Sequence, residues 1–104
     1  MIEHNDRLTQ AIEEGRSSAS YLWQVPDDAE TRQRMEKLLH VIQRESSDSG
    51  RREMPSICEK LLTALRATPS PQQIDILQDG FDRLYKLCLA AKSGLMTGPI
   101  AQRS

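Results

Sequence analysis

Apolar residues recur along most of the chain at intervals of three and four positions, the spacing of one face of an α-helix. No Asn-Gly or Asp-Gly pair lies between two segments of alternating polarity, so a β-hairpin is not indicated. The pattern predicts helices over residues 5–24, 28–46, 52–66 and 71–93. The side chains expected to face the core are Leu8, Ala11, Ile12, Ala19, Leu22, Trp23, Met35, Leu38, Leu39, Ile42, Met54, Ile57, Cys58, Leu61, Leu62, Leu65, Ile74, Leu77, Phe81, Leu84, Tyr85 and Cys88.

Residues that favour helix ends bound these segments. Pro26 ends the first helix, because the residue before a proline is disfavoured in helical conformation. Either Asp27 or Asp28 is suited to cap the second helix. Ser70 and Pro71 supply an N-cap and a first-turn proline for the fourth.

Short connections between long helices favour neighbours that run in opposite directions. The sequence therefore predicts an all-α protein, an antiparallel up-down-up-down four-helix bundle over residues 5–93. We expect residues 1–4 to form a flexible arm and residues 94–104 a flexible tail. Gly15 is expected to weaken the first helix by about 1 kcal/mol relative to alanine.

Composition narrows the range of functions. With 104 residues the chain is one small domain. Its 14 basic and 15 acidic side chains give a net charge of −1, which argues against a nucleic-acid partner. No apolar run approaches the ~20 residues that span a bilayer, and the N-terminus lacks the pattern of a secretory signal. We expect a cytoplasmic protein without a membrane partner.

The two cysteines, Cys58 and Cys88, lie in apolar segments. A zinc site would need closely spaced pairs of Cys or His, which the chain lacks, so neither a metal nor a cofactor is expected. We expect both cysteines to be buried reduced thiols, with an interhelical disulfide as the alternative. Catalytic motifs of common enzyme classes are also missing, and an enzyme is not indicated.

His40 is the residue most suggestive of chemistry. Leu39 and Ile42 belong to the apolar face of the second helix, and at ~100° per residue His40 is turned away from it. An exposed imidazole on a rigid helix is accessible to a partner's active site and is nucleophilic in its neutral form. An ordinary surface histidine is the alternative.

The segment from His40 to Gly50 resembles the signature of histidine-containing phosphotransfer domains, roughly His-x-Leu-Lys-Gly-x-Ser/Ala, a polar run and Gly. Ile42 matches the leucine of that signature. The apolar residues of the next helix fall at matching spacings, and the likeness covers most of residues 5–93. These residues are Met54, Ile57, Cys58 and Leu61. The resemblance implies a non-enzymatic signalling module, with His40 as phosphoacceptor, that docks a receiver domain or a histidine kinase.

Two positions depart from the family pattern. Gln43 replaces the lysine, a cation that would help to attract the phosphoryl group. Arg44 replaces the glycine one turn after His40, where it either supplies the missing charge or crowds the docking surface. These departures suggest a degenerate domain, which leaves a non-phosphorylated adaptor as the other interpretation. The candidate partner-binding residues are Gln43, Arg44, Ser47, Arg51 and Trp23.

A structural or dimerisation bundle, in which His40 is incidental, is the competing hypothesis. Trp23 either plugs the end of the bundle or belongs to a docking patch. Ile76, Leu87 and Leu89 fall outside the main apolar face of the fourth helix, which suggests further packing, for example in a homodimer. The arginines around the turn after the second helix either bind an acidic partner or are simply solvated.

Overall fold

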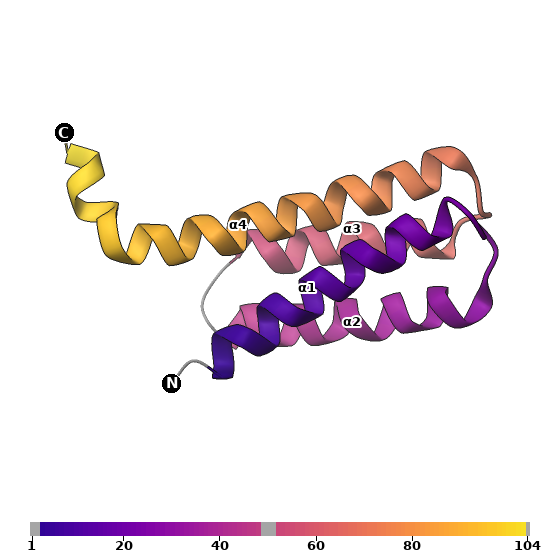
Figure 1. Cartoon of the computed structure of the whole chain (residues 1–104), viewed down its shortest axis with the longest axis horizontal. Helices are drawn as coiled ribbons and strands as arrows, with labels where there is room; N and C mark the ends of the chain where they lie inside the picture. Colours follow the sequence, from indigo (N-terminus) through magenta and orange to yellow (C-terminus); the bar gives the residue numbers. More distant parts are fainter. Residues whose placement is uncertain (1–2, 49–51, 104) are drawn as a thin grey trace.

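The computed structural model describes the backbone of residues 3–48 and 52–103 and the side chains of residues 7–47 and 52–90. The described chain is all-helical, with four helices and no strand in these ranges (Figure 1). Their bounds are α1 Glu3–Leu22, α2 Ala29–Asp48, α3 Glu53–Arg66 and α4 Pro71–Arg103.

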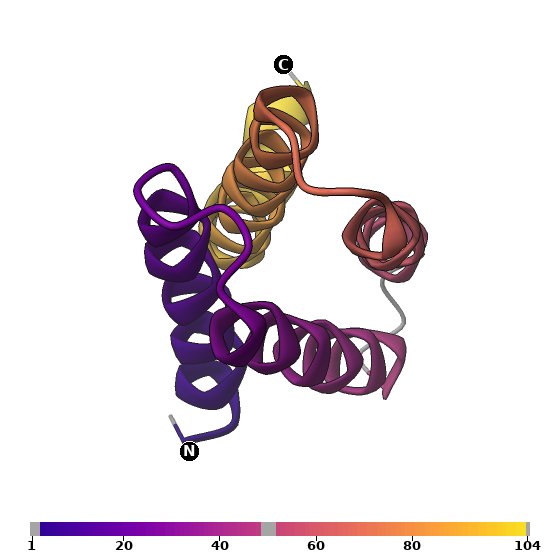
Figure 2. The same ribbon diagram turned by 90° about the vertical axis from the view of Figure 1, so that its right-hand side faces the viewer.

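The helices surround one aliphatic core. Figure 2, which looks along the molecule, shows them arranged around a common centre. Both α1 and α3 pack against α2 and α4, so the four helices close into a ring of neighbours. Their buried apolar residues form a single cluster, as the helical spacing predicts. Its fully buried members include Ile12, Leu22, Met35, Leu39, Ile42, Met54, Ile74, Leu77, Phe81 and Leu84.

Local capping confirms the predicted starts of two helices. Asp28 accepts hydrogen bonds from the backbone N–H of Thr31, at 3.0 Å, and from its hydroxyl. These bonds lower the pKa of the Asp28 carboxyl below its ordinary value, the hydroxyl bond contributing most. Ser70 accepts a 3.1 Å bond from the backbone N–H of Gln73, and Pro71 is the first residue of α4.

Gly15 has a packing role that its effect on helix propensity does not reveal. A Cβ atom at this position would lie 2.0 Å from Cε1 of Phe81, whose ring is fully buried. The missing side chain therefore lets the Phe81 ring of α4 pack directly on the α1 backbone. The same holds for Gly80, where a Cβ would lie 2.3 Å from a methyl group of Leu61.

The two terminal helices differ from the predicted bounds. The first begins at Glu3, inside the expected arm, and ends at Leu22, two residues before the predicted end, so it is shifted but not longer. The fourth is longer, because it continues past residue 93 to Arg103 (Figure 1). Gly94 and Gly98 lower helix propensity without forbidding a helix, which explains why the predicted end was placed too early. The yellow end of α4 bends, and this part of the chain contains Pro99, which lacks a backbone N–H.

A polar network joins the end of α3 to α2 and α4. The Arg32 guanidinium donates to the carbonyl of Leu65 at 2.7 Å and to that of Ala67 at 3.1 Å. Gln73, which is buried, donates to the carbonyls of Ala64 and Ala67 at 2.7 and 2.8 Å and accepts from Arg32 at 3.0 Å. These bonds satisfy carbonyls that the last turn of a helix leaves without partners.

Both cysteines are buried and unpaired, as expected from the sequence. Burial raises the pKa of the Cys58 thiol to about 12, which keeps it protonated and unreactive at neutral pH. Within the described ranges, no helix has both the length and the apolar character needed to cross a bilayer.

Candidate functional site

His40 lies on the solvent-facing side of α2, as its place in the helical pattern predicts. Its side chain is exposed, whereas Leu39 and Ile42 are fully buried. Packing of these two residues against the core fixes the rotation of α2 about its axis. The imidazole is therefore presented at the surface by a rigid element rather than by a loop.

An open groove of about 430 Å³ between α2 and α3 contains this histidine. We call it the His40 groove. Its lining residues are His40, Gln43, Glu59, Lys60, Leu62, Thr63 and Arg66. A further recess of about 260 Å³ along the same two helices shares Leu62 and Arg66, so the hollow extends toward the start of α2.

Two cations of α3 line the groove together with His40. Neither Lys60 nor Arg66 forms an ion pair with a side chain among residues 7–47 and 52–90. Glu59 adds one carboxylate, and the Thr63 hydroxyl donates to the Glu59 carbonyl at 3.0 Å. The lining thus combines one imidazole, two cations and one carboxylate, a net positive charge that favours an anionic group beside His40.

The structure separates the residues that the sequence groups as partner-binding. Gln43 lines the groove, and its amide donates to the carbonyl of Pro55 in the first turn of α3 at 3.3 Å. Arg44 and Ser47 are exposed but are not among the lining residues. Arg51 lies outside the described residues, and Trp23 lies at the end of α1, on a different helix pair.

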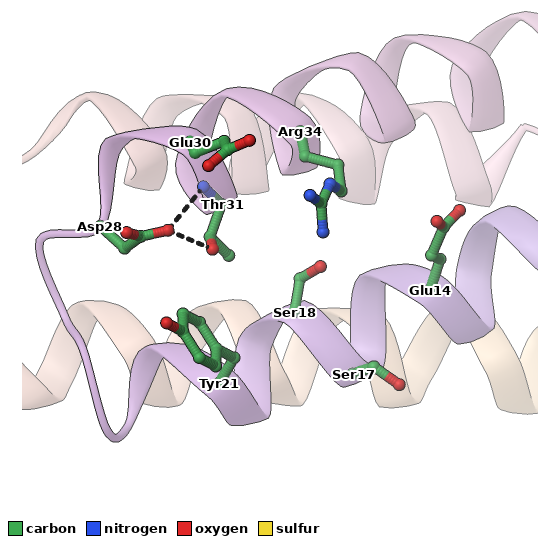
Figure 3. A pocket seen from close by; sticks show the side chains of 8 residues that line it. All are labelled: Glu14, Ser17, Ser18, Tyr21, Asp28, Glu30, Thr31 and Arg34. Carbon is green, nitrogen blue, oxygen red and sulfur yellow. Dashed lines mark hydrogen bonds between the residues drawn. The ribbon is translucent and has the colours of Figure 1, made fainter.

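A second hollow, of about 370 Å³, lies between α1 and α2 (Figure 3). We call it the Ser18 cavity, after a buried serine in its wall. Its lining residues are Glu14, Ser17, Ser18, Tyr21, Asp28, Glu30, Thr31 and Arg34. It shares no lining residue with the His40 groove.

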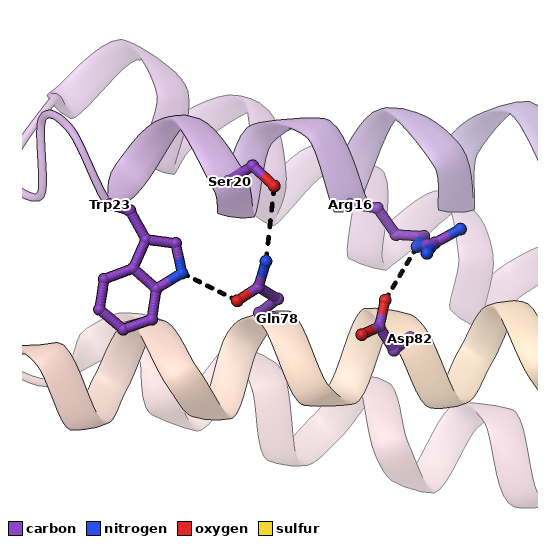
Figure 4. Close-up of polar contacts among 5 residues, drawn as sticks. All are labelled: Arg16, Ser20, Trp23, Gln78 and Asp82. Atoms are coloured by element: carbon purple, nitrogen blue, oxygen red, sulfur yellow. Dashed lines mark hydrogen bonds and ion pairs between the residues drawn. The ribbon is translucent and has the colours of Figure 1, made fainter.

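Polar side chains that bond one another cross the boundary between α1 and α4 (Figure 4). Arg16 pairs with Asp82 at 2.9 Å and lies over the ring of Tyr85, 4.3 Å from its centroid. The indole N–H of Trp23 donates to Gln78 Oε1 at 2.8 Å. We call this row the α1–α4 seam. Trp23 is 44% exposed, so the predictions that it faces the core or plugs the end of the bundle are wrong. It lies just after the end of α1, and its indole N–H is bonded to α4.

No protein family model, curated protein or solved structure matches the chain. Within the described residues, no group of three or more His, Cys, Asp or Glu side chains is placed to hold a metal ion. The groove around His40 is therefore the feature of the molecule from which a function can be inferred.

Sequence reasoning missed the contribution of α3 to the groove. Lys60, Thr63 and Arg66 are polar positions beside the apolar face that carries Leu61, Leu62 and Leu65, and on their own they indicate only a solvated surface. A signal was nevertheless present, because the spacing of Lys60, Thr63 and Arg66 is that of a single helix face. Placing them in one groove with His40 requires the register between α2 and α3.

Proposed function

We propose that the chain is an antiparallel up-down-up-down bundle of the phosphotransfer type, with His40 as phosphoacceptor. Its partners would be a receiver domain or a histidine kinase, which supplies the catalytic groups, so the chain itself is not an enzyme. The observation that carries the proposal is the exposed His40 at the edge of a groove that also contains Lys60 and Arg66.

The packing order supports the antiparallel topology. Helices that follow one another in the chain pack side by side, and α1 also packs on α4. The connection from α1 to α2 spans residues 23–28, and that from α3 to α4 spans residues 67–70. Connections this short favour antiparallel neighbours over a crossover to the far end of the next helix.

The proposed reaction requires only one nucleophile from this chain. The unprotonated ring nitrogen of His40 attacks the phosphorus of an aspartyl phosphate on the partner. The N–P bond forms, the P–O bond of the acyl phosphate breaks, and the aspartate leaves as a carboxylate with the bonding electron pair. The proton on the other ring nitrogen stays in place, and the reverse transfer regenerates neutral His40.

The cations of α3 compensate for the substitution at position 43. In the family pattern a lysine on the histidine's own helix provides positive charge, and here Gln43 is tied to α3 instead. Lys60 and Arg66 line the same groove and lack ion-pair partners among the described side chains. Both are suited to charge-assisted hydrogen bonds with phosphoryl oxygens.

Arg44 does not line the groove that contains His40. Its exposed side chain is free of hydrogen bonds and ion pairs to the described part of the chain. A docking receiver domain can therefore displace it by rotation of its flexible stem, so arginine at this position is compatible with access to the imidazole.

Labelling with phosphoramidate tests the proposal without a cognate partner. We expect the wild-type chain to acquire an acid-labile, base-stable phosphate, seen as a shifted band in a phosphate-affinity gel. His40→Gln should abolish the label, whereas His4→Gln, the matched change at the chain's other histidine, should retain it. An unlabelled folded wild type, beside an active phosphotransfer domain labelled in parallel, would contradict the relay function and favour an adaptor.

A second candidate is a dimerisation bundle. Four large apolar side chains are exposed on the described surface, which is the observation in its favour. They are Tyr21, Trp23, Ile76 and Leu89, whereas Leu87 packs partly against the core. Sedimentation equilibrium distinguishes the candidates: a dimer that dissociates in Ile76→Gln or Leu89→Gln supports dimerisation, and a monomer at all concentrations contradicts it.

A further inference from the structure

The Ser18 cavity between α1 and α2 has the features of a binding site that is independent of His40. It is open to solvent and is lined by side chains of both helices and of the connection between them, and its volume of about 370 Å³ is within the range of small-molecule sites. Its lining includes one guanidinium, three carboxylates and two buried hydroxyls, those of Ser18 and Thr31, of which the Thr31 hydroxyl already donates to Asp28.

Ser18 provides the first evidence for a ligand. Its residue surface is only 6% exposed, and its hydroxyl forms no hydrogen bond within the part of the chain that the structure describes. Figure 3 shows this hydroxyl directed into the space between the helices. Buried hydroxyls in native proteins nearly always have a partner, so this one is expected to meet a group that enters the cavity.

Opposite charges on the two walls of the cavity provide the second piece of evidence for a ligand. Arg34 of α2 and Glu14 of α1 both line the cavity, and neither forms a hydrogen bond or a close ion pair with any described side chain, although the charge of Arg34 also contributes to lowering the pKa of Asp28. In Figure 3 the guanidinium of Arg34 faces the Ser18 hydroxyl, and Glu14 lies to one side of them. Asp28 differs, because Thr31 already occupies its carboxylate.

We propose that the Ser18 cavity binds a small zwitterion, namely a free α-amino acid. The ligand carboxylate lies between the Arg34 guanidinium and the Ser18 hydroxyl, and the ammonium group lies beside Glu14. The ligand side chain extends along the ring of Tyr21, which is 45% exposed at the cavity wall.

The charges of the lining favour a zwitterion over a simple ion. Glu14, Asp28 and Glu30 outnumber Arg34, so an isolated anion is repelled by the lining as a whole. An isolated cation placed beside the Ser18 hydroxyl is repelled by Arg34, because the guanidinium faces that hydroxyl. A carboxylate and an ammonium group on one carbon satisfy both walls together, and bidentate pairing with arginine favours the carboxylate.

The test titrates the full-length ¹⁵N-labelled chain with each of the twenty L-amino acids, followed by ¹H–¹⁵N NMR. We expect saturable shifts at the amides around Ser18 and Arg34 for at least one of them. The tightest binder is then compared with its analogue lacking the amino group and its analogue lacking the carboxylate. Each analogue should bind roughly tenfold more weakly or worse, since it loses one of the two charged contacts.

Variants assign the contacts. Arg34→Gln should weaken binding roughly tenfold, because it removes the ion pair with the ligand carboxylate, and Ser18→Ala roughly threefold, because it removes a single hydrogen bond from a hydroxyl to that carboxylate. Lys37→Gln, the matched change at an exposed α2 residue outside the cavity lining, should leave affinity unchanged. Far-UV circular dichroism confirms that each variant is folded.

Three results would overturn the proposal. The first is the absence of a saturable shift near Ser18 with all twenty amino acids. The second is an analogue that binds as tightly as its parent amino acid. The third is Lys37→Gln weakening affinity as much as Arg34→Gln, which would indicate a non-specific charge effect. None of these measurements depends on phosphorylation of His40, so their outcome is independent of the proposed phosphotransfer function.

Discussion

Along the α1–α4 seam the polar side chains bond one another, whereas in the His40 groove the charged side chains of α3 face solvent. Arg16 has both a carboxylate and an aromatic ring as partners. Lys60 and Arg66 form no ion pair among residues 7–47 and 52–90. Both regions lie between neighbouring helices, so the difference is in the pairing of their charges and not in their place in the fold.

This difference separates charges that hold the bundle together from charges that are available to a partner. A paired side chain has already used its interactions within the molecule, and its loss affects stability. An unpaired cation at the surface contributes little to stability and much to recognition. Substitutions in the two regions should therefore move different quantities.

Gly15→Ala, at the interface of α1 with Phe81, should have the largest effect on stability. The new Cβ overlaps a buried ring, and overpacking of about 1–3 kcal/mol exceeds the gain in helix propensity of about 1 kcal/mol. We expect a net loss of about 1 kcal/mol in the free energy of unfolding, measured by urea denaturation. Gln10→Ala, at an exposed position of the same helix, should change it by less than ~0.5 kcal/mol. If Gly15→Ala proved more stable than wild type, the Phe81 ring would have to shift away from the new methyl group without a loss of packing energy.

The Arg16–Asp82 ion pair should contribute less to the free energy of unfolding than the packing at Gly15 does. Its side chains are 42% and 43% exposed, so solvent screens the interaction. A double-mutant cycle with Arg16→Gln and Asp82→Asn should give a coupling free energy of about 0.5–1 kcal/mol that decreases in 1 M salt. A coupling free energy of zero at low salt would show that this ion pair of the seam does not stabilise the bundle.

The Asp28 cap should make a pH-dependent contribution. Its pKa is lower in the folded chain, so its stabilising effect is present above the ordinary aspartate pKa and is lost as the pH falls through the folded value. Asp28→Asn should therefore be less stable than wild type at pH 7, and the two should converge in acid. Denaturation midpoints at both pH values check this, and a constant difference would contradict it.

Lys60→Gln and Arg66→Gln should have the smallest effect on stability and a clear effect on function. We expect the free energy of unfolding to change by less than ~0.5 kcal/mol. The rate of His40 phosphorylation by phosphoramidate should fall roughly tenfold in the double variant, since the groove loses both donors to the phosphoryl oxygens. Lys86→Gln, on the exposed surface of α4, is the matched control and should retain the wild-type rate. A large loss of stability would place these cations among the structural residues.

Local sequence patterns were sufficient to predict the buried helix faces, the exposure of His40 and two of the helix caps. Helical spacing identified the buried faces and left His40 exposed, and the caps at Asp28 and Ser70 depend on residues three positions away. The Arg32 network was not predictable, because its acceptors come from a different helix and from the connection after it. The presence of His40, Lys60 and Arg66 in one groove likewise depends on how α2 and α3 pack. Sequence spacing within either helix does not contain that information.

Whether His40 is the phosphoacceptor is best tested by ¹⁵N NMR of the histidine side chains before and after treatment with phosphoramidate. The chain has two histidines, so His40→Gln assigns both rings. We predict that phosphorylation changes the ring nitrogens of His40, and that amide shifts cluster around the His40 groove on α2 and α3 while the α1–α4 seam is unaffected. Modification of His4 instead, or an unmodified His40 in the folded chain, would contradict the assignment of this groove as a phosphotransfer site.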